Sequence, residues 1–228
     1  MGLSSCRKGF PWDLSKVQSS NCAYDGLVMP ICANSSRCPG ICVSHKSGST
    51  FFKFAMHREL HRHGTRLRYE TGCTGVHCAR FPWPPWRAPE RVIRIVRHPE
   101  TRLLSAYLQK KHLKYRPPGF TFPHNASFEY VVRRVTSLPD LLVNPHLRRQ
   151  AAMCARPPLV PQIVLRLEEY ATWRAWLLKE LQWSYDALPE SPNAPLTSPE
   201  RVDEYYTPEL KALVARWAVI DLQEFGYV

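Results

Sequence analysis

The sequence has 228 residues, 44% of them hydrophobic, and its 31 Lys and Arg exceed its 19 Asp and Glu by 12. This length and composition fit one sizeable globular domain with a full core and exclude a wholly disordered chain. The positive charge favours an anionic partner: a nucleotide, a nucleic acid, an acidic polysaccharide or a membrane surface.

The N-terminal segment, residues 1–38, has no hydrophobic periodicity, and we expect it to be irregular. Five of the eight cysteines lie within the first 42 residues. An even number of cysteines suits a disulfide framework in an oxidising compartment; free thiols remain open, and zinc is disfavoured because no C-x-x-C pair occurs. Asn34 and Asn125 each begin an N-glycosylation triplet. The sequence shows no signal peptide, and no window approaches the roughly 18 apolar residues of a membrane helix.

Strands and helices alternate in the first half of the remaining chain. "ICVS" (41–44) predicts a short buried strand, and a four-residue apolar period predicts a helix from Thr50 to about His63. "FPWPPWRAPE" (81–90) predicts a loop because it is rich in proline. "RVIRIV" (91–96) predicts a second strand, followed by a helix from Pro99 to about Leu113.

The second half continues the alternation. "SFEYVVRRVTSL" (127–138) predicts an amphipathic helix with one apolar face, made of Phe128, Val131, Val132 and Val135. "QIVLRL" (162–167) predicts a third strand, and residues 168–183 a long helix. A proline-rich connector precedes one last helix over 208–225. We therefore expect a single α/β domain over 39–228, a three-layer sandwich with a mainly parallel central sheet.

Two strand-to-helix turns carry residues that suit anions. In "CVSHKSGSTFF" the helix start at Ser47, Gly48, Ser49 and Thr50 offers backbone N–H groups, and Lys46 adds a positive charge. The spelling differs from the usual phosphate loop, because the lysine precedes the glycine. In "VRHPETRLLSAY" the second strand ends at Arg97, and Ser105 lies two turns into the next helix. Two anion sites at neighbouring strand ends predict a ligand with two separated anionic groups.

These two segments together resemble the paired signature of sulfotransferases, which use 3′-phosphoadenosine 5′-phosphosulfate. "NPHLRRQAAMC" (144–154) is similar to the N-x-H-W-x-P-Q…C segment of Golgi carbohydrate sulfotransferases of the chondroitin 4-O and HNK-1 type. "VLRLEEYATW" resembles their strand that ends in an acidic residue, and "YYTPELKALVARWAVIDLQEFGY" resembles their C-terminal ending. The resemblance covers about residues 40–228. It departs at His45, where the family usually has proline, and at Pro157, where it has a second cysteine.

The resemblance implies roles for the two turns. The donor loop, which we define as residues 46–52, would bind the 5′-phosphosulfate, with Phe51 and Phe52 completing it; Arg97 and Ser105 would bind the 3′-phosphate. Lys46 would also be catalytic, because its charge offsets the charge that develops on the departing phosphate. This scheme requires no metal. By resemblance the protein would work in the Golgi lumen or the secretory pathway.

The acceptor hydroxyl needs a base, and histidine is the commonest choice. His146 is the leading candidate because it falls in the segment similar to N-x-H, although a structural role in its loop is an open alternative. Glu168 and Glu169, at the end of a strand, are further alternatives. We expect the side chain of His45 to point away from that of Lys46.

The sequence predicts a transferase of sulfuryl groups to a hydroxyl, with a carbohydrate as acceptor. A polyanionic glycan is favoured because the segment 53–68 carries many cations, namely Lys53, Arg58, Arg62, Arg66 and Arg68. Two alternatives stay open: a phosphate-loop kinase, and a non-catalytic basic protein that binds glycan or nucleic acid. No nucleic-acid-binding motif occurs in the sequence, so we expect no nucleic-acid partner.

Overall fold

The computed structural model describes residues 28–30, 40–62, 68–69, 79–80, 91–111, 120, 122–153, 162–191 and 199–228. Several predicted features lie outside these residues: most of the N-terminal segment, the loop 81–90, the glycosylation triplet at Asn34 and every cysteine other than Cys42. The predictions made for these features therefore concern residues that the structure does not describe. Cys42 is disulfide-bonded. In the part of the chain that the structure describes, no helix is long and apolar enough to cross a membrane.

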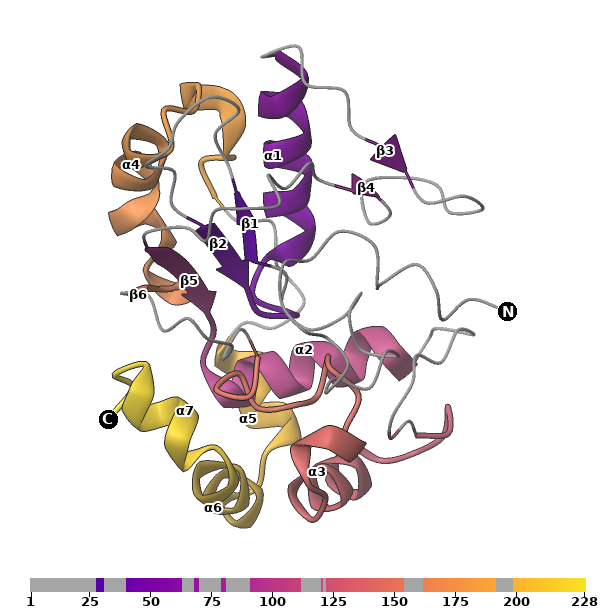
Figure 1. Ribbon diagram of the computed structural model, residues 1–228. Helices are drawn as coiled ribbons and strands as arrows, with labels where there is room; N and C mark the ends of the chain where they lie inside the picture. Colours follow the sequence, from indigo (N-terminus) through magenta and orange to yellow (C-terminus); the bar gives the residue numbers. More distant parts are fainter. Residues whose placement is uncertain are drawn as a thin grey trace.

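A parallel sheet lies at the centre of the fold (Figure 1). β2 (Gly40–Val43), β5 (Val92–Val96) and β6 (Gln162–Arg166) run parallel, in that order, and β1 (Val28–Pro30) pairs antiparallel with β2. Cys42 lies opposite Arg94, which in turn lies opposite Val164. The expected α/β class with a mainly parallel sheet is confirmed. Two short strands, β3 (Arg68–Tyr69) and β4 (Ala79–Arg80), form a separate pair.

The first hydrophobic core lies on one face of the sheet. Alternate strand residues point to that face, and they pack against α1 (Ser49–Arg62) and α4 (Tyr170–Glu180). Phe52 of α1 is 2% exposed and its ring stacks on Trp173 of α4, with 6.2 Å between centroids. The strand residues of this core are Ile41, Val43, Ile93, Ile95 and Leu165.

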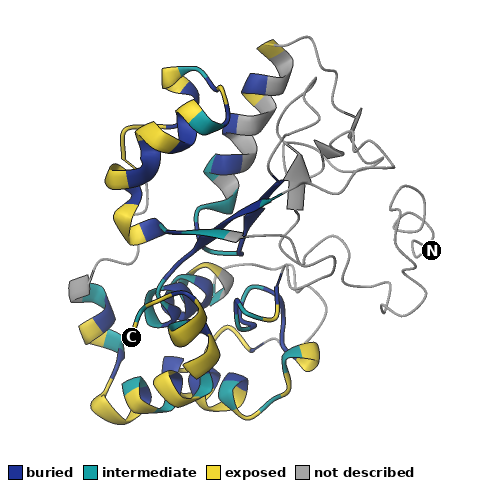
Figure 2. Ribbon diagram, turned by 60° about the vertical axis from the view of Figure 1, so that its left-hand side comes forward, coloured by how far each residue is buried: buried dark blue, intermediate teal, exposed yellow. Residues whose placement is uncertain are grey.

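The second core lies beyond the carboxyl ends of the strands and is helical. It joins α2 (Pro99–Lys111), α3 (Phe128–Thr136), α5 (Pro199–Tyr205) and α6 (Pro208–Trp217). Figure 2 shows β2 and β5 buried and the helices of this group exposed on their outer sides. The turn between β5 and α2 connects the two cores, so the strand ends of the sheet lie between them (Figure 1).

The helix α3 illustrates how sequence pattern becomes structure. The predicted apolar face is buried, with Val131, Val132 and Val135 at 0% exposed. Ser127 caps the helix because its Oγ accepts a hydrogen bond from the N–H of Tyr130 at 3.1 Å. Periodicity and cap agree, and the observed helix falls within the predicted range 127–138.

Three elements differ from the expectation. β1 lies within the segment 1–38 that was expected to be irregular. α5 lies partly within the expected proline-rich connector, and it begins at Pro199, a residue that fits the first helical position. The single last helix is in fact two, α6 and α7 (Val219–Glu224), because Ala218 departs from helical geometry at φ −95° and ψ 18°.

Candidate functional site

The structure brings the two predicted turns together. β2 and β5 are adjacent and parallel, so the donor loop after β2 and Arg97 after β5 lie at the same edge of the sheet. Nη1 of Arg97 donates a hydrogen bond to the backbone carbonyl of Lys46 at 3.3 Å. The two cationic residues therefore belong to one site, although 51 positions separate them in the sequence.

The donor loop has a backbone that few residues adopt. Lys46 and Gly48 have φ of 69° and 84°, both in the left-handed region, and the N–H of Ser47 bonds back to the carbonyl of Ser44 at 3.0 Å. α1 begins at Ser49, directly after this turn. The first N–H groups of a helix have no partner within the helix, so the loop directs donors and a positive dipole end outward. Strained non-glycine backbone of this kind is characteristic of functional sites.

The side chains of the donor loop point in different directions. Nζ of Lys46 donates to Oε1 of Gln109 on α2 at 2.8 Å, which holds the ammonium across the site from its own strand. The hydroxyl of Ser47 is buried and bonded within the protein, and the ring of Phe52 belongs to the first core. Phe51 is half-buried, with its ring edge-on to Tyr170 at 5.7 Å. The side chain of Thr50 lies outside the described residues.

Arg97 is 8% exposed, and burial lowers the pKa of its guanidinium while the nearby charge of Glu168 opposes that shift. A guanidinium stays charged at neutral pH in such a setting, so the site keeps its positive charge. The environment is partly desolvated, and a hydrogen bond from Arg97 to an anion would therefore be stronger than one made in bulk water.

Ser105 lies on the helix face that borders the site. Thr101, Ser105 and Gln109 follow one another at four-residue intervals, so they share one face of α2. Thr101 lies near Glu168, at 3.5 Å between Oγ1 and Oε1, and Gln109 contacts Lys46. Ser105 is half-buried between these two contacts. The structure thus places Ser105 on the side of α2 that holds the lysine.

His146 lies close to the donor loop. Its ring packs against that of His45, with 4.4 Å between centroids. Oδ1 of Asn144 is within 2.9 Å of the backbone N of His146 and 3.0 Å of its Nδ1. A backbone N–H can only donate, so this atom of Asn144 is the acceptor oxygen, and Nδ1 must also donate to it. In the neutral imidazole Nε2 then carries the lone pair, as a general base requires.

Arg102 ties the segment that carries His146 to the donor loop. Its side chain is 1% exposed and donates to three carbonyls: His45 at 2.8 Å, Arg148 at 2.6 Å and Pro145 at 3.2 Å. Burial lowers the pKa of Arg102 to about 10. Because all three acceptors are main-chain atoms, Arg102 fixes backbone positions on both sides of the site. No role was assigned to Arg102 from the sequence; the only sequence signal was its place directly before two apolar residues, Leu103 and Leu104.

Gln150 was not predicted at all. Its side-chain Oε1 accepts from Oγ of Ser47 at 3.1 Å and from the N–H of Arg97 at 2.9 Å, and its Nε2 donates to the carbonyl of Arg97 at 2.7 Å. Gln150 is fully buried. The only sequence signal was the segment "NPHLRRQ", which ends in this residue.

Glu168 forms a third group at the edge of the sheet, after β6. Its Oε1 accepts from the N–H of His98 at 2.7 Å, and its Oε2 accepts from the hydroxyl of Tyr227 at 3.0 Å. Burial, followed by the charge of Glu168, raises the pKa of the Tyr227 hydroxyl. Glu168 therefore connects the C-terminal residues to the turn that begins α2. The other acidic alternative, Glu169, pairs with Arg166 at 3.0 Å.

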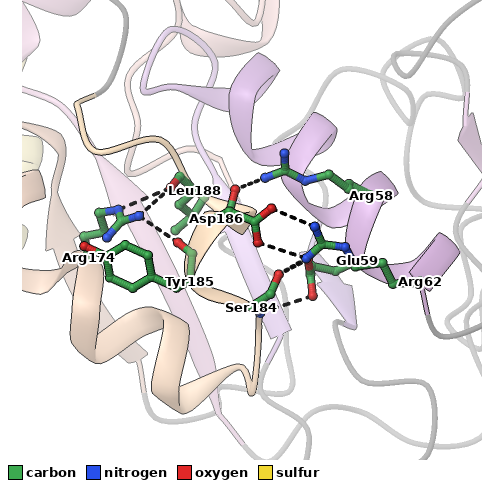
Figure 3. Close-up of polar contacts among 8 residues, drawn as sticks. All are labelled: Arg58, Glu59, Arg62, Arg174, Ser184, Tyr185, Asp186 and Leu188. Atoms are coloured by element: carbon green, nitrogen blue, oxygen red, sulfur yellow. Dashed lines mark hydrogen bonds and ion pairs between the residues drawn. The ribbon is translucent and has the colours of Figure 1, made fainter.

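The arginines of α1 bind another part of the protein. Arg62 pairs with Asp186 at 2.7 Å and with Glu59 at 2.8 Å, and Arg58 donates to the carbonyl of Asp186 (Figure 3). Ser184 donates to the buried Glu59 at 2.5 Å. The contacts attach α1 to the 3-10 turn η7 (Tyr185–Ala187). Arg58 and Arg62 thus join two parts of the fold. These two guanidinium groups of the segment 53–68 are already bonded to the protein, which makes them less suited to bind a polyanion.

Comparisons of the chain with protein-family models, with curated proteins and with solved structures found no match. Within the described residues, no group of three or more His, Cys, Asp or Glu side chains is placed to hold a metal ion. The functional assignment therefore depends on the sequence motifs and on the geometry of the site.

Proposed function

We propose that this protein is a sulfotransferase, which moves a sulfuryl group from 3′-phosphoadenosine 5′-phosphosulfate to a hydroxyl of a carbohydrate. One observation carries the proposal: Lys46 and Arg97 follow adjacent parallel strands and are joined by a hydrogen bond at the sheet edge where α1 begins. Ligands of open α/β sheets bind beyond the carboxyl ends of the strands. The resemblance of both turns to the paired sulfotransferase signature supports the same assignment.

The chemistry of the residues fits the two anionic ends of such a donor. The start of α1 offers main-chain N–H groups at Ser49 and Thr50, and the ammonium of Lys46, which donates to Gln109 on the facing helix, lies at the same turn and could exchange that bond for one to a ligand. Arg97 and Ser105 would take the 3′-phosphate. Ser47 and Phe52 would act indirectly, through the position of the loop, because their side chains face the protein interior.

The reaction would proceed by in-line displacement at sulfur. The acceptor oxygen forms a bond to sulfur, the bond from sulfur to the phosphate oxygen breaks, and the electron pair stays on the departing phosphate. Lys46 would offset the charge that develops there, which is an electrostatic contribution to the transition state. The hydroxyl proton would pass to Nε2 of His146, whose Nδ1 is held by Asn144.

We also propose the finer architecture that the family implies, a three-layer sandwich with a phosphate-loop-like site. α1 and α4 cover one face of the sheet. On the other face, Arg94 of β5 pairs with Glu224 at 3.0 Å and lies 4.5 Å from the ring centre of Phe225. The C-terminal segment thus contributes to a covering of the second face.

The acceptor class follows from the remaining charge and from the resemblance to carbohydrate enzymes. A net charge of +12 exceeds what one donor molecule needs, which favours a polyanionic glycan. Two of the cations behind that expectation, Arg58 and Arg62, are bonded to η7, so any polyanion would rely mainly on others.

Transfer of radioactive sulfate from the labelled donor to polysaccharides, glycolipids and small alcohols tests the proposal. We expect transfer to at least one carbohydrate, and we expect Lys46→Ala to lose turnover, mainly in kcat, because the ammonium acts in the transition state. Lys179→Ala is the matched control, since this exposed lysine lies on α4, outside the site. No transfer to any acceptor, or normal turnover by Lys46→Ala, would contradict the proposal.

A further inference from the structure

Gln150 connects the two halves of the candidate site. One amide group bonds to the donor loop through Ser47 and to both the N–H and the carbonyl of Arg97. The paired bonds to Arg97 fix the orientation of the amide, because its oxygen must accept and its nitrogen must donate. The hydroxyl of Ser47 donates to this oriented oxygen, Oε1 of Gln150, at 3.1 Å. Gln150 therefore ties the donor loop to the end of β5, in addition to the direct hydrogen bond from Arg97 to the carbonyl of Lys46.

Gln150 is itself held from the C-terminal helix. Its N–H donates to Oδ2 of Asp221 at 2.8 Å, and the N–H of Ala151 donates to Oδ1 at 2.7 Å. Asp221 belongs to α7 and is 1% exposed. Both oxygens of the carboxylate are thus used by two successive N–H groups. Arg94 adds a hydrogen bond to the carbonyl of Gln150.

These contacts form a continuous chain of buried hydrogen bonds, from Asp221 through Gln150 to Ser47 and Arg97. Each bond lies where water cannot substitute for a lost partner, so removal of one member leaves a polar group unsatisfied. The break between α6 and α7 matters for this chain of contacts, because Asp221 of α7 accepts the hydrogen bonds from residues 150 and 151.

We propose that Gln150 is a positioning residue of the donor site, held in place by Asp221, and that it sets the spacing between the two anion-binding halves. The proposal rests on the sulfotransferase function proposed above. It assigns to Gln150 no contact with the donor. Its effect is on the geometry with which Lys46 and Arg97 meet the two anionic groups of one ligand.

The proposal is tested by calorimetric titration with adenosine 3′,5′-bisphosphate. This ligand has two phosphates, one for each anion-binding half of the site, so its affinity depends on the spacing between the halves. Gln150→Leu should bind it about tenfold more weakly or worse, and should lower kcat, while the KM for the acceptor stays unchanged. Gln223→Leu is the matched control, because Gln223 is exposed on α7, and it should bind as the wild type does. A structural role alone would lower thermal stability but leave the affinity of the folded protein unchanged, and that result would overturn the proposal.

A double-mutant cycle that combines Gln150→Leu with Ser47→Ala tests whether Ser47 affects ligand binding through Gln150 or by direct contact with the ligand. If Ser47 acts through Gln150, then Ser47→Ala should weaken binding in the wild-type background and have little further effect in Gln150→Leu. Fully additive effects would mean that each residue contacts the ligand independently, and they would overturn the proposal. If Gln150→Leu does not fold, the Ser47→Ala variant alone tests the proposal. Unchanged affinity of Ser47→Ala for adenosine 3′,5′-bisphosphate would refute it.

The wild-type titration distinguishes the two levels of failure. If the wild type binds the bisphosphate and the Gln150 variants bind it equally well, the positioning role is refuted and the sulfotransferase proposal stands. If the wild type does not bind the bisphosphate, both are refuted.

Discussion

Gly48 offers a quantitative test of the donor loop. At its φ of +84° any side chain is strained, and a Cβ added there would lie 2.3 Å from Cε1 of Phe51. A left-handed conformation costs an alanine roughly 1–2 kcal/mol. The ring of Phe51 has little room to move, because it packs on Phe52 at 4.3 Å and on Tyr170 at 5.7 Å between centroids. Overpacking of this kind adds about 1–3 kcal/mol.

Gly48→Ala should therefore lower the free energy of unfolding by about 2–5 kcal/mol, the sum of the two contributions. Gly226→Ala is the matched control. Gly226 also has positive φ, +68°, but its Cβ would meet only the end of the Arg166 side chain, Nη2, at 2.6 Å. The guanidinium is at the end of a long side chain and can move away if it gives up its hydrogen bonds to the carbonyls of Phe225 and Gly226, so this variant should lose about 1–3 kcal/mol, less than Gly48→Ala. Urea denaturation of both variants measures the difference, and equal losses would refute the account of a tightly fixed loop.

Three further predictions concern binding, pH and salt. Arg97→Ala and Ser105→Ala should each weaken calorimetric binding of adenosine 3′,5′-bisphosphate about tenfold, and unchanged affinity in both would remove them from the site. Hydrogen bonds from the Arg62 guanidinium lower the pKa of the Asp186 carboxyl, so its stabilising contribution is complete above the unfolded pKa of about 3.9 and is lost as pH falls below it. The stability gap between wild type and Asp186→Asn, measured by urea denaturation, should narrow below about pH 4, and a gap independent of pH would contradict this. For a polyanionic acceptor, the acceptor KM should rise more steeply with salt than the donor KM, and equal slopes would argue against such an acceptor.

The elements that sequence could predict are those with local causes. The burial of Val131, Val132 and Val135 follows from a helical period within one segment, and β5 follows from a short apolar run bounded by turn signals. The meeting of Lys46 and Arg97 was also predictable, because it requires only that two successive strands be parallel neighbours.

The remaining features arise from contacts between distant segments. Gln150 meets Ser47 across 103 positions and Asp221 across 71, and no local pattern distinguishes such a glutamine from an exposed one. From the sequence, the arginines of α1 were assigned to a cationic surface for a polyanion, because their partner Asp186 is 124 positions from Arg62 and no local pattern indicates that contact. Periodicity identifies the face of a helix that is polar, but only the tertiary fold determines what that face contacts.

The central claim is that Lys46 and Arg97 belong to one site for a ligand with two separated anionic groups. The most direct measurement is calorimetric titration of the wild type with adenosine 3′,5′-bisphosphate, adenosine 5′-phosphate and ATP. The account predicts that the bisphosphate binds at least about tenfold more tightly than the monophosphate, because the monophosphate leaves one anion site empty, and that ATP binds more weakly than the bisphosphate. Equal affinity for the bisphosphate and the monophosphate, or tighter binding of ATP, would contradict it.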